Sequence, residues 1–189
     1  KSELSSADER KKANIENTIS ELYFSKKEYQ NAVIHANQAI IHAKNQQDAK
    51  QELRGQINGG NASKKSKNFK RAISFYNSAI RISESQQESE LTSYAYESLG
   101  FCFSELGNHT KSIASYESAI TSAGNNAKAI ASIHSRIGYN YFKAGKLKES
   151  ISSYEKACEL YKELDEPQSY ANTLLNQGRV YANYGDYES

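Results

Sequence analysis

The sequence predicts an all-α fold built from a repeated pair of antiparallel helices. Three observations lead to this prediction. Two sequence blocks recur with a constant period, the apolar residues within each block have helical spacing, and glycines stand between the blocks. A fixed period of about 20 to 50 residues is typical of arrays in which one small structural unit is stacked repeatedly.

The first helix of each unit is marked by a glycine within an apolar and aromatic segment. The clearest copies cover residues 96–107, 134–145 and 174–185. Their first glycines are Gly100, Gly138 and Gly178, so the period is about 40 residues, within the range of known repeat families. These segments align without gaps, so they predict equivalent helices.

The second helix of each unit is marked by a block with a small residue near its end. These small residues are Ala39, Ala79, Ala119 and Ala157, and they keep the same period of about 40 residues. Apolar residues within the block recur at helical intervals, as in Ile113, Tyr116 and Ile120. The two blocks therefore predict a helical hairpin. A single array spans 1–189, with approximate repeats 13–52, 53–92, 93–130, 131–170 and a partial repeat 171–189.

The glycines between the blocks predict where helices end. Gly107 and Gly145 follow the first helix of their repeats. Glycine is favoured there because the left-handed conformation that ends many helices costs other residues about 1 to 2 kcal/mol.

Composition excludes several classes of protein. The 24 basic and 22 acidic residues nearly cancel, so net charge gives no reason to expect nucleic acid or membrane partners. No apolar run approaches the roughly 20 residues of a transmembrane helix. Two cysteines do not make a disulfide framework, and we expect Cys102 and Cys158 to be buried thiols. Because methionine is absent even at residue 1, we expect a processed chain or an excised fragment.

The repeat resembles the tetratricopeptide repeat (TPR). The residues that carry the resemblance in one repeat are Leu99, Gly100, Phe103, Gly107, Tyr116 and Ala119, with Ser112 in place of the usual alanine. The family implies a right-handed α-solenoid, the TPR superhelix. The period near 40 exceeds the usual 34 or so, as in long repeats of bacterial signalling proteins and kinesin light chains. The extra residues near 45–48, 85–88 and 124–126 predict flanking helices about one turn longer.

The first helix of repeat 2, expected at about 51–66, departs from the pattern. Gly59 and Gly60 are adjacent within it, and each costs about 1 kcal/mol relative to alanine in a helix interior. One interpretation is a weak or bent helix. The other is that Gly55, Gly59 and Gly60 permit close helix packing.

The chain contains none of the short motifs of common enzymes, so we expect a noncatalytic protein without a cofactor or metal. Only His35 and His42, seven residues apart, could share a helix face, which is half of a zinc site at most. The charge run Lys64, Lys65, Lys67, Lys70 and Arg71 is either a solvated corner or an edge that attracts anions.

The TPR resemblance implies that ligands bind along the first helices, in a concave groove. Asparagines there can bond peptide amides, arginines and lysines attract carboxylates, and aromatic residues offer apolar anchors. The candidate binding residues are Arg54, Asn58, Asn61, Lys64, Lys65, Phe101, Arg136, Tyr139, Phe142, Lys143, Asn176, Arg179 and Asn183. The basic residue expected for a chaperone-tail carboxylate clamp is absent from the matching positions, among them Asn17 and Ile57.

The sequence thus predicts a noncatalytic protein- or peptide-binding scaffold. We expect it to be the sensing or interaction region of a larger bacterial signalling or regulatory protein. The alternative is a structural assembly module that self-associates through repeat edges without a peptide ligand. Neither nucleic acid nor a membrane segment is expected.

Overall fold

The computed structural model describes the backbone of residues 2–188 and the side chains of residues 11–183 and 185. Over these residues the chain forms nine α-helices and no strand, which confirms the all-α prediction. The helices are α1 (Ser2–Ser25), α2 (Tyr29–Asn45), α3 (Ala49–Lys65), α4 (Phe69–Ser85), α5 (Ser89–Glu105), α6 (His109–Ser122), α7 (Ala127–Lys143), α8 (Leu147–Glu163) and α9 (Pro167–Glu188).

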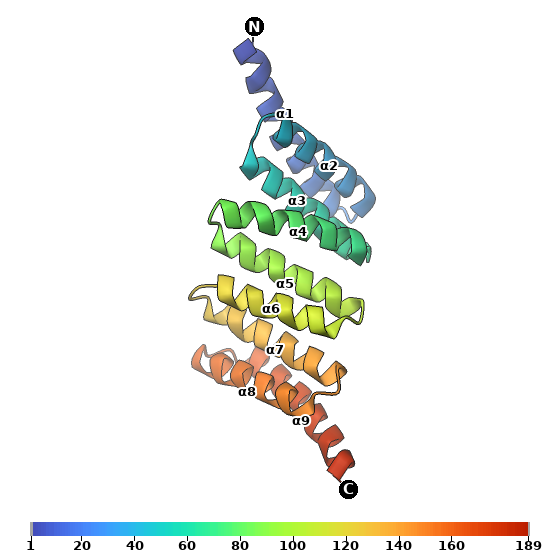
Figure 1. The fold of residues 1–189 in the computed structure, drawn as a ribbon, viewed down its shortest axis with the longest axis vertical. Coiled ribbons are helices and arrows are strands. Elements are labelled where there is room, and N and C mark those ends of the chain that lie inside the picture. The colour runs from blue at the N-terminus through green and yellow to red at the C-terminus, as the bar shows by residue number, and fades with distance from the viewer. Residues whose placement is uncertain (1, 189) are drawn as a thin grey trace. The chain divides into compact units, whose positions relative to one another are not determined.

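The helices form two compact units, Lys1–Ala95 and Tyr96–Ser189, and α5 contributes to both. In the first unit α1 packs on α2, α2 on α3 and α3 on α4; in the second, α6 packs on α7, α7 on α8 and α8 on α9. Figure 1 shows that, within each unit, these consecutive helices lie side by side and each reverses the direction of the one before.

Helix and loop lengths account for the sequence period. The helices α2, α3, α4, α5, α7 and α8 each have 17 residues. Each of them is followed by a three-residue connection, so two successive helices with their connections give the period of about 40 residues. Helix α6 has only 14 residues and a four-residue connection, 123–126, so its repeat is slightly shorter. The prediction of longer helices beside 124–126 is therefore wrong for α6: the residues there extend the connection instead.

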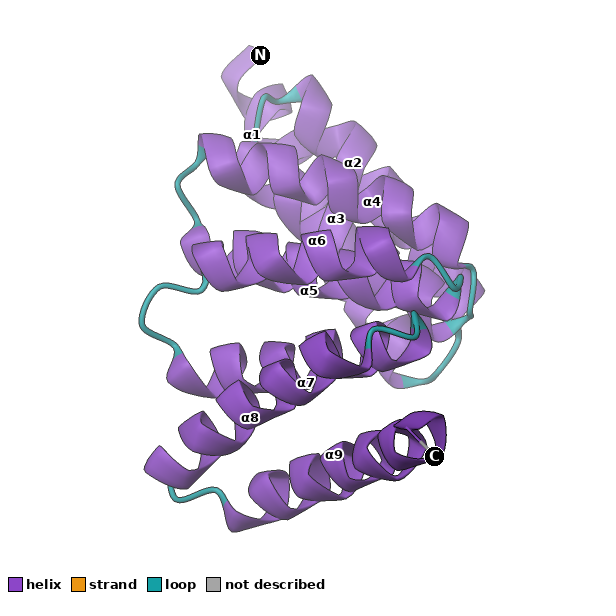
Figure 2. Ribbon diagram, turned by 60° about the horizontal axis from the view of Figure 1, so that its bottom comes forward, coloured by secondary structure: helices purple, strands orange, loops and turns teal. Residues whose placement is uncertain are grey.

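Every connection between helices contains one residue in the left-handed conformation, and Figure 2 shows how short these loops are. Gly107 and Gly145 have φ of 73° and 74°, which confirms the predicted helix ends. Lysine, glutamine or aspartate takes the same role elsewhere, for example Lys67 at φ 59°. The next residue often caps the following helix, as Asn68 does by accepting from the Arg71 N–H at 3.2 Å.

Contacts between glycines and aromatic rings join the helices of three hairpins, α3–α4, α5–α6 and α7–α8. A Cβ atom on Gly60 would lie 2.7 Å from the Tyr76 ring, and one on Gly59 would lie 2.6 Å from the Phe75 ring. Helix α3 is continuous through both glycines. The structure thus shows the close packing that was one of the two interpretations of this segment.

The same contact recurs in the second unit. The Tyr116 ring lies against Gly100, and Tyr116 is 1% exposed. The Ser112 hydroxyl donates to the Gly100 carbonyl at 2.7 Å, so serine at this position adds a hydrogen bond that alanine would lack. Cys102 and Cys158 are buried thiols outside any disulfide, as predicted.

Candidate functional site

All thirteen predicted binding residues lie on the first helices of the pairs, divided between the two units. Those of the first unit, all on α3, are Arg54, Asn58, Asn61, Lys64 and Lys65. Those of the second unit are Phe101 on α5, then Arg136, Tyr139, Phe142 and Lys143 on α7, and Asn176, Arg179 and Asn183 on α9.

The second unit brings four of these residues together around one pocket of about 360 Å³. Phe101 and Tyr139 give it aromatic surface, while Arg136 and Asn176 supply a cation and an amide. Six residues outside the candidate set also line it: Ser104, Glu105, Tyr116, Ser132, Ser135 and Asn140. The combination of aromatic walls with a few convergent polar groups is typical of ligand sites.

Arg136 is the cationic centre of this pocket. Its Nε atom lies 3.2 Å from Glu97 Oε1, close enough for an ion pair. That Nε is nevertheless buried without a hydrogen-bond partner among the described residues, so the contact with Glu97 is a charge attraction with poor hydrogen-bond geometry. Burial raises the pKa of the neighbouring Tyr116 to about 12, opposed by the Arg136 charge, so this phenol stays protonated at neutral pH.

Three other predicted residues line a smaller pocket of about 280 Å³: Phe142, Lys143 and Asn183. Arg179 is exposed and donates from Nη1 to Asn176 Oδ1 at 3.4 Å. The Asn183 amide donates to the Arg179 carbonyl at 2.8 Å. Part of the hydrogen-bonding capacity of these asparagines is therefore used within α9.

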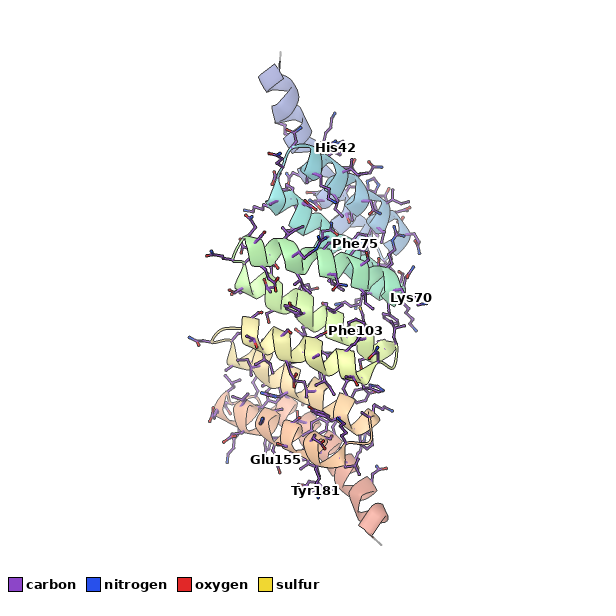
Figure 3. The ribbon with its side chains drawn as sticks, viewed as in Figure 1. His42, Lys70, Phe75, Phe103, Glu155 and Tyr181 are labelled. Atoms are coloured by element: carbon purple, nitrogen blue, oxygen red, sulfur yellow. The ribbon has the colours of Figure 1, made fainter. Side chains whose placement is uncertain are left out.

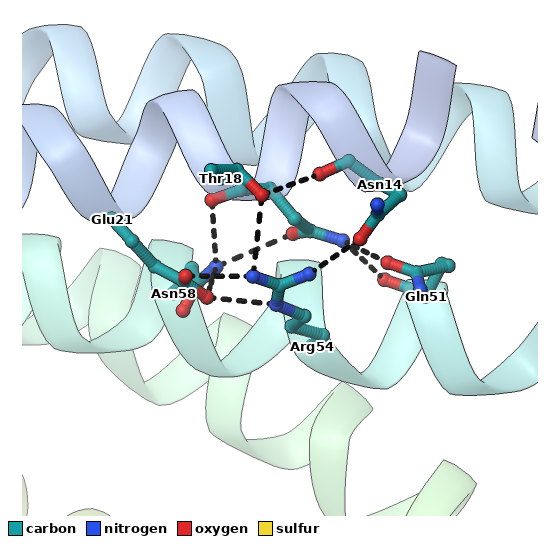
Figure 4. A network of polar contacts seen from close by, with 7 residues as sticks. Asn14, Thr18, Glu21, Gln51, Arg54 and Asn58 are labelled. Carbon is teal, nitrogen blue, oxygen red and sulfur yellow. Dashed lines mark hydrogen bonds and ion pairs between the residues drawn. The ribbon is translucent and has the colours of Figure 1, made fainter. Parts of the chain in front are cut away.

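In the first unit, Arg54 lies in a polar network between α1 and α3 (Figure 4). It forms a two-pronged ion pair with Glu21, with Nε to Oε1 at 2.8 Å and Nη2 to Oε2 at 2.7 Å. Arg54 Nη1 also donates to Asn14 Oδ1 at 2.8 Å. The Asn58 amide donates to Glu21 Oε1 at 3.1 Å.

The network sets the protonation of its members. Hydrogen bonding by Arg54 is the main cause that lowers the pKa of Glu21 below its usual 4.5, and burial opposes it. Glu21 in turn raises the pKa of Arg54 through the same hydrogen bonds. Both groups are therefore charged at neutral pH, and the carboxylate that Arg54 was expected to take from a ligand is supplied by Glu21.

Beside this network lies a pocket of about 510 Å³. Leu53, Ile57 and Leu91 give it apolar surface, and Arg54 and Asn58 stand at its polar side.

Asn61 and Lys64 form a separate cluster with two tyrosines. Asn61 Oδ1 accepts hydrogen bonds from Tyr76 at 2.7 Å and from Tyr94 at 2.6 Å. The Lys64 ammonium lies 5.5 and 5.6 Å from the centres of the same rings. Lys65 is exposed at the end of α3. This part of the predicted surface is thus already engaged in contacts within the unit.

Sequence reasoning missed the two acidic partners, Glu21 for Arg54 and Glu97 for Arg136. The two ion pairs join residues at different separations along the chain, so the repeat period does not predict them. One signal was available for the second pair: all charged residues of α5 are acidic, and all those of α7 are basic.

His35, one of the two histidines that could share a helix face, makes contacts within its unit. His35 stacks on Tyr23, with ring centres 5.1 Å apart, and its Nδ1 lies 2.6 Å from Glu16 Oε2. Within the described part of the chain, no three histidine, cysteine or acidic side chains are grouped as metal ligands. None of the described helices has the length and apolar character needed to span a bilayer.

Several solved structures share this fold. The apo form of RapI matches with a TM-score of 0.81 at 18% identity, covering 92% of this chain and 49% of RapI. A Rap protein complexed with competence and sporulation factor matches at 0.71 and 16%, covering 87% and 46%. A STAND protein with a tetratricopeptide repeat sensor, from Pyrococcus horikoshii, matches at 0.82 and 13%, covering 92% and 28%.

These likenesses show the fold alone, because every identity is low, and this chain spans about half the length of the Rap proteins. A comparison with curated proteins finds no match. Two family models do match, both of the tetratricopeptide repeat, at residues 93–126 and 129–189, which together make up half of the chain. With the helical hairpins and their glycine–tyrosine contacts, these matches show that the chain belongs to the tetratricopeptide repeat family.

Proposed function

We propose that this chain is a noncatalytic binding module that holds a peptide or an extended protein segment on the first helices of its repeats. The observation that carries the proposal is the pocket of the second unit, where Phe101, Arg136, Tyr139 and Asn176 converge. An aromatic or aliphatic side chain would enter between Phe101 and Tyr139. A ligand carboxylate would bind Arg136, and the Asn176 amide would bond a main-chain group.

The solved relatives support the general class of function. One Rap protein was crystallised with competence and sporulation factor, and the STAND protein uses its tetratricopeptide repeats as a sensor. We therefore propose that this chain is the sensing or interaction region of a larger bacterial signalling or regulatory protein. The complete gene tests this proposal. An output domain encoded next to the repeats would support it, and a gene that encodes only repeats would contradict it.

The binding proposal is tested with a random peptide library. Peptides captured by the wild type are labelled, and fluorescence anisotropy measures their affinity for the wild type and for three variants. The variants are Tyr139→Ala, Arg136→Gln and the control Glu155→Ala. Tyr139 is 46% exposed, so its loss removes ligand contact with little loss of core. Glu155 is exposed on α8, as Figure 3 shows.

We expect Tyr139→Ala and Arg136→Gln each to weaken binding by about tenfold, which corresponds to about 1.4 kcal/mol. Glu155→Ala should bind like the wild type. Circular dichroism checks that Arg136→Gln keeps its helices after losing the Glu97 ion pair. Wild-type affinity in both pocket variants would show that this pocket is not the binding site.

A further inference from the structure

The two edges of the first unit carry opposite charge. Because α1, α2, α3 and α4 alternate in direction, connections 26–28 and 66–68 lie at one edge, while connections 46–48 and 86–88 lie at the other. Figure 1 shows this alternation, and Lys70 is labelled at the first of these edges in Figure 3.

One edge is strongly basic. Residues 22–32 and 62–72 contain seven lysines or arginines and a single acidic residue, Glu28. We call this the basic edge; its cations are Lys26, Lys27, Lys64, Lys65, Lys67, Lys70 and Arg71. All are exposed except Lys64, which is half-buried.

The opposite edge is acidic. Residues 42–52 and 82–92, windows of the same length, contain five acidic residues and only two lysines. We call this the acidic edge; its carboxylates belong to Asp48, Glu52, Glu84, Glu88 and Glu90. Lys44 pairs with Glu52 at 3.6 Å, so one of the two lysines is already matched.

Most cations of the basic edge are left without acidic partners inside the unit. Among the described residues, no carboxylate lies within 4 Å of Lys26, Lys27, Lys65, Lys67 or Lys70. Like charges gathered on one face repel each other, which makes a partner of opposite charge favourable.

We propose that the basic edge of one copy of this chain binds the acidic edge of a second copy. The complementary surface is present on the same unit, and the connections on both edges recur at the same spacing along the chain. Because α1 packs directly on α3, the two connections of the basic edge lie at neighbouring helix ends, and their charges form one surface.

A nucleic acid is the less favoured partner. The chain as a whole carries only +2, whereas domains that bind polyanions usually have a strong net positive charge. The aromatic rings near the basic edge also face other side chains: Phe24 packs on Tyr29 with ring centres 5.6 Å apart, and Arg71 lies over Phe75. They do not offer free stacking surfaces for bases.

Binding of unlike edges leaves one basic and one acidic edge free at the ends of each complex. Such a head-to-tail contact adds further copies, as an open chain or a closed ring, and so gives larger assemblies as concentration rises. It is also independent of the second-unit pocket proposed to bind peptides. Loss of self-association would therefore leave peptide binding unchanged, and the two proposals fail separately.

Sedimentation velocity of the full chain, from about 10 μM to about 1 mM, tests the proposal, because association by mass action depends on concentration. We expect larger species to appear with concentration in about 50 mM NaCl, and the association constant to fall at least about tenfold in about 500 mM NaCl because salt screens exposed charges.

Two charge variants identify the surfaces. The basic-edge variant carries Lys26→Glu, Lys67→Glu and Lys70→Glu; the acidic-edge variant carries Glu88→Lys and Glu90→Lys. Each keeps one native edge. Each alone should be monomeric, and their mixture should form a complex of one copy of each that grows no further.

The control variant changes net charge by the same amount as the basic-edge variant, at exposed sites of α8: Lys148→Glu, Lys156→Glu and Lys162→Glu. It should associate like the wild type, and circular dichroism checks the helix content of all variants. The proposal is overturned if the wild type is monomeric throughout, or if both edge variants still associate alone. A monomeric wild type that binds heparin through the basic edge would identify a polyanion as the partner instead.

Discussion

The same substitution should have opposite effects at two equivalent glycines of the second unit. Gly100 and Gly178 occupy the same repeat position in α5 and α9. A Cβ atom on Gly100 would lie 2.9 Å from two atoms of the Tyr116 ring, whereas one on Gly178 would meet nothing within 4 Å. Alanine improves a helix interior by about 1 kcal/mol relative to glycine. Only at Gly100 must a buried ring move to accept it.

The magnitude follows from packing. Carbon atoms are normally about 3.5 to 4.0 Å apart, so the Tyr116 ring would have to move by roughly half an ångström or more. Overpacking of this kind costs about 1 to 3 kcal/mol. After the gain in helix propensity, we expect Gly100→Ala to lose about 1 kcal/mol of unfolding free energy and Gly178→Ala to gain about 1 kcal/mol.

Urea unfolding followed by circular dichroism measures both variants. Because the two glycines lie in the same compact unit, the same transition reports on them. If Gly100→Ala stabilises the protein as much as Gly178→Ala, then the ring contact has no energetic weight and the packing argument is wrong.

Three further predictions use the same measurement. Ser112→Ala removes the hydrogen bond to Gly100 and should lower the free energy of unfolding by about 1 kcal/mol. Its control, Ser63→Ala, should be neutral or stabilising, because the buried Ser63 hydroxyl has no hydrogen-bond partner among the described residues. Lys67→Gly should raise the free energy of unfolding by up to about 1 kcal/mol, because it places glycine at φ 59°. A lower free energy of unfolding would show that Lys67 is unstrained in this left-handed conformation. Burial, and to a smaller extent the charge of Lys156, lowers the pKa of His134 below 6.5. As the pH falls, the unfolded chain therefore binds the proton before the folded chain does, and the free energy of unfolding decreases below about pH 6.5. A His134→Gln variant should show a smaller loss between about pH 7 and pH 5, and an unchanged loss would exclude this histidine as the cause.

The hairpins could be predicted from sequence because each contact that defines them leaves a residue-level pattern. The glycine–tyrosine contact fixes both partners at constant spacing, as in Gly100 with Tyr116 and Gly138 with Tyr154. Small residues at the crossing and apolar residues at helical intervals then follow from packing geometry. The matching tetratricopeptide repeat models and the nine helices of the described chain confirm this part.

The connections could be predicted only where glycine marks them. Lys27, Gln47, Lys67, Gln87 and Asp165 take the left-handed conformation without glycine. Their cost of about 1 to 2 kcal/mol each is offset by the hydrogen bonds of the turn and by packing of the helices on either side. Because tertiary packing supplies this energy, residue type alone does not reveal these positions.

The candidate site could be predicted only in part. The sequence placed Phe101, Arg136, Tyr139 and Asn176 on first helices, and the structure brings them to one pocket. Whether they bind a ligand remains a proposal. The pairing of Arg136 with Glu97 was missed, because it depends on how neighbouring helices cross.

This internal pairing determines how much binding energy an acidic ligand can gain. Arg136 already has Glu97 at 3.2 Å, so a ligand carboxylate contributes only the difference between its own contact and the one it replaces or shares. That difference is favourable because Glu97 makes no hydrogen bond with Nε, and 42% of the Arg136 side chain stays exposed for a ligand to contact. Arg54 offers no such gain, because Glu21 already meets it with two short hydrogen bonds. A carboxylate-bearing ligand should therefore prefer the Arg136 pocket over Arg54, even though both positions present an arginine.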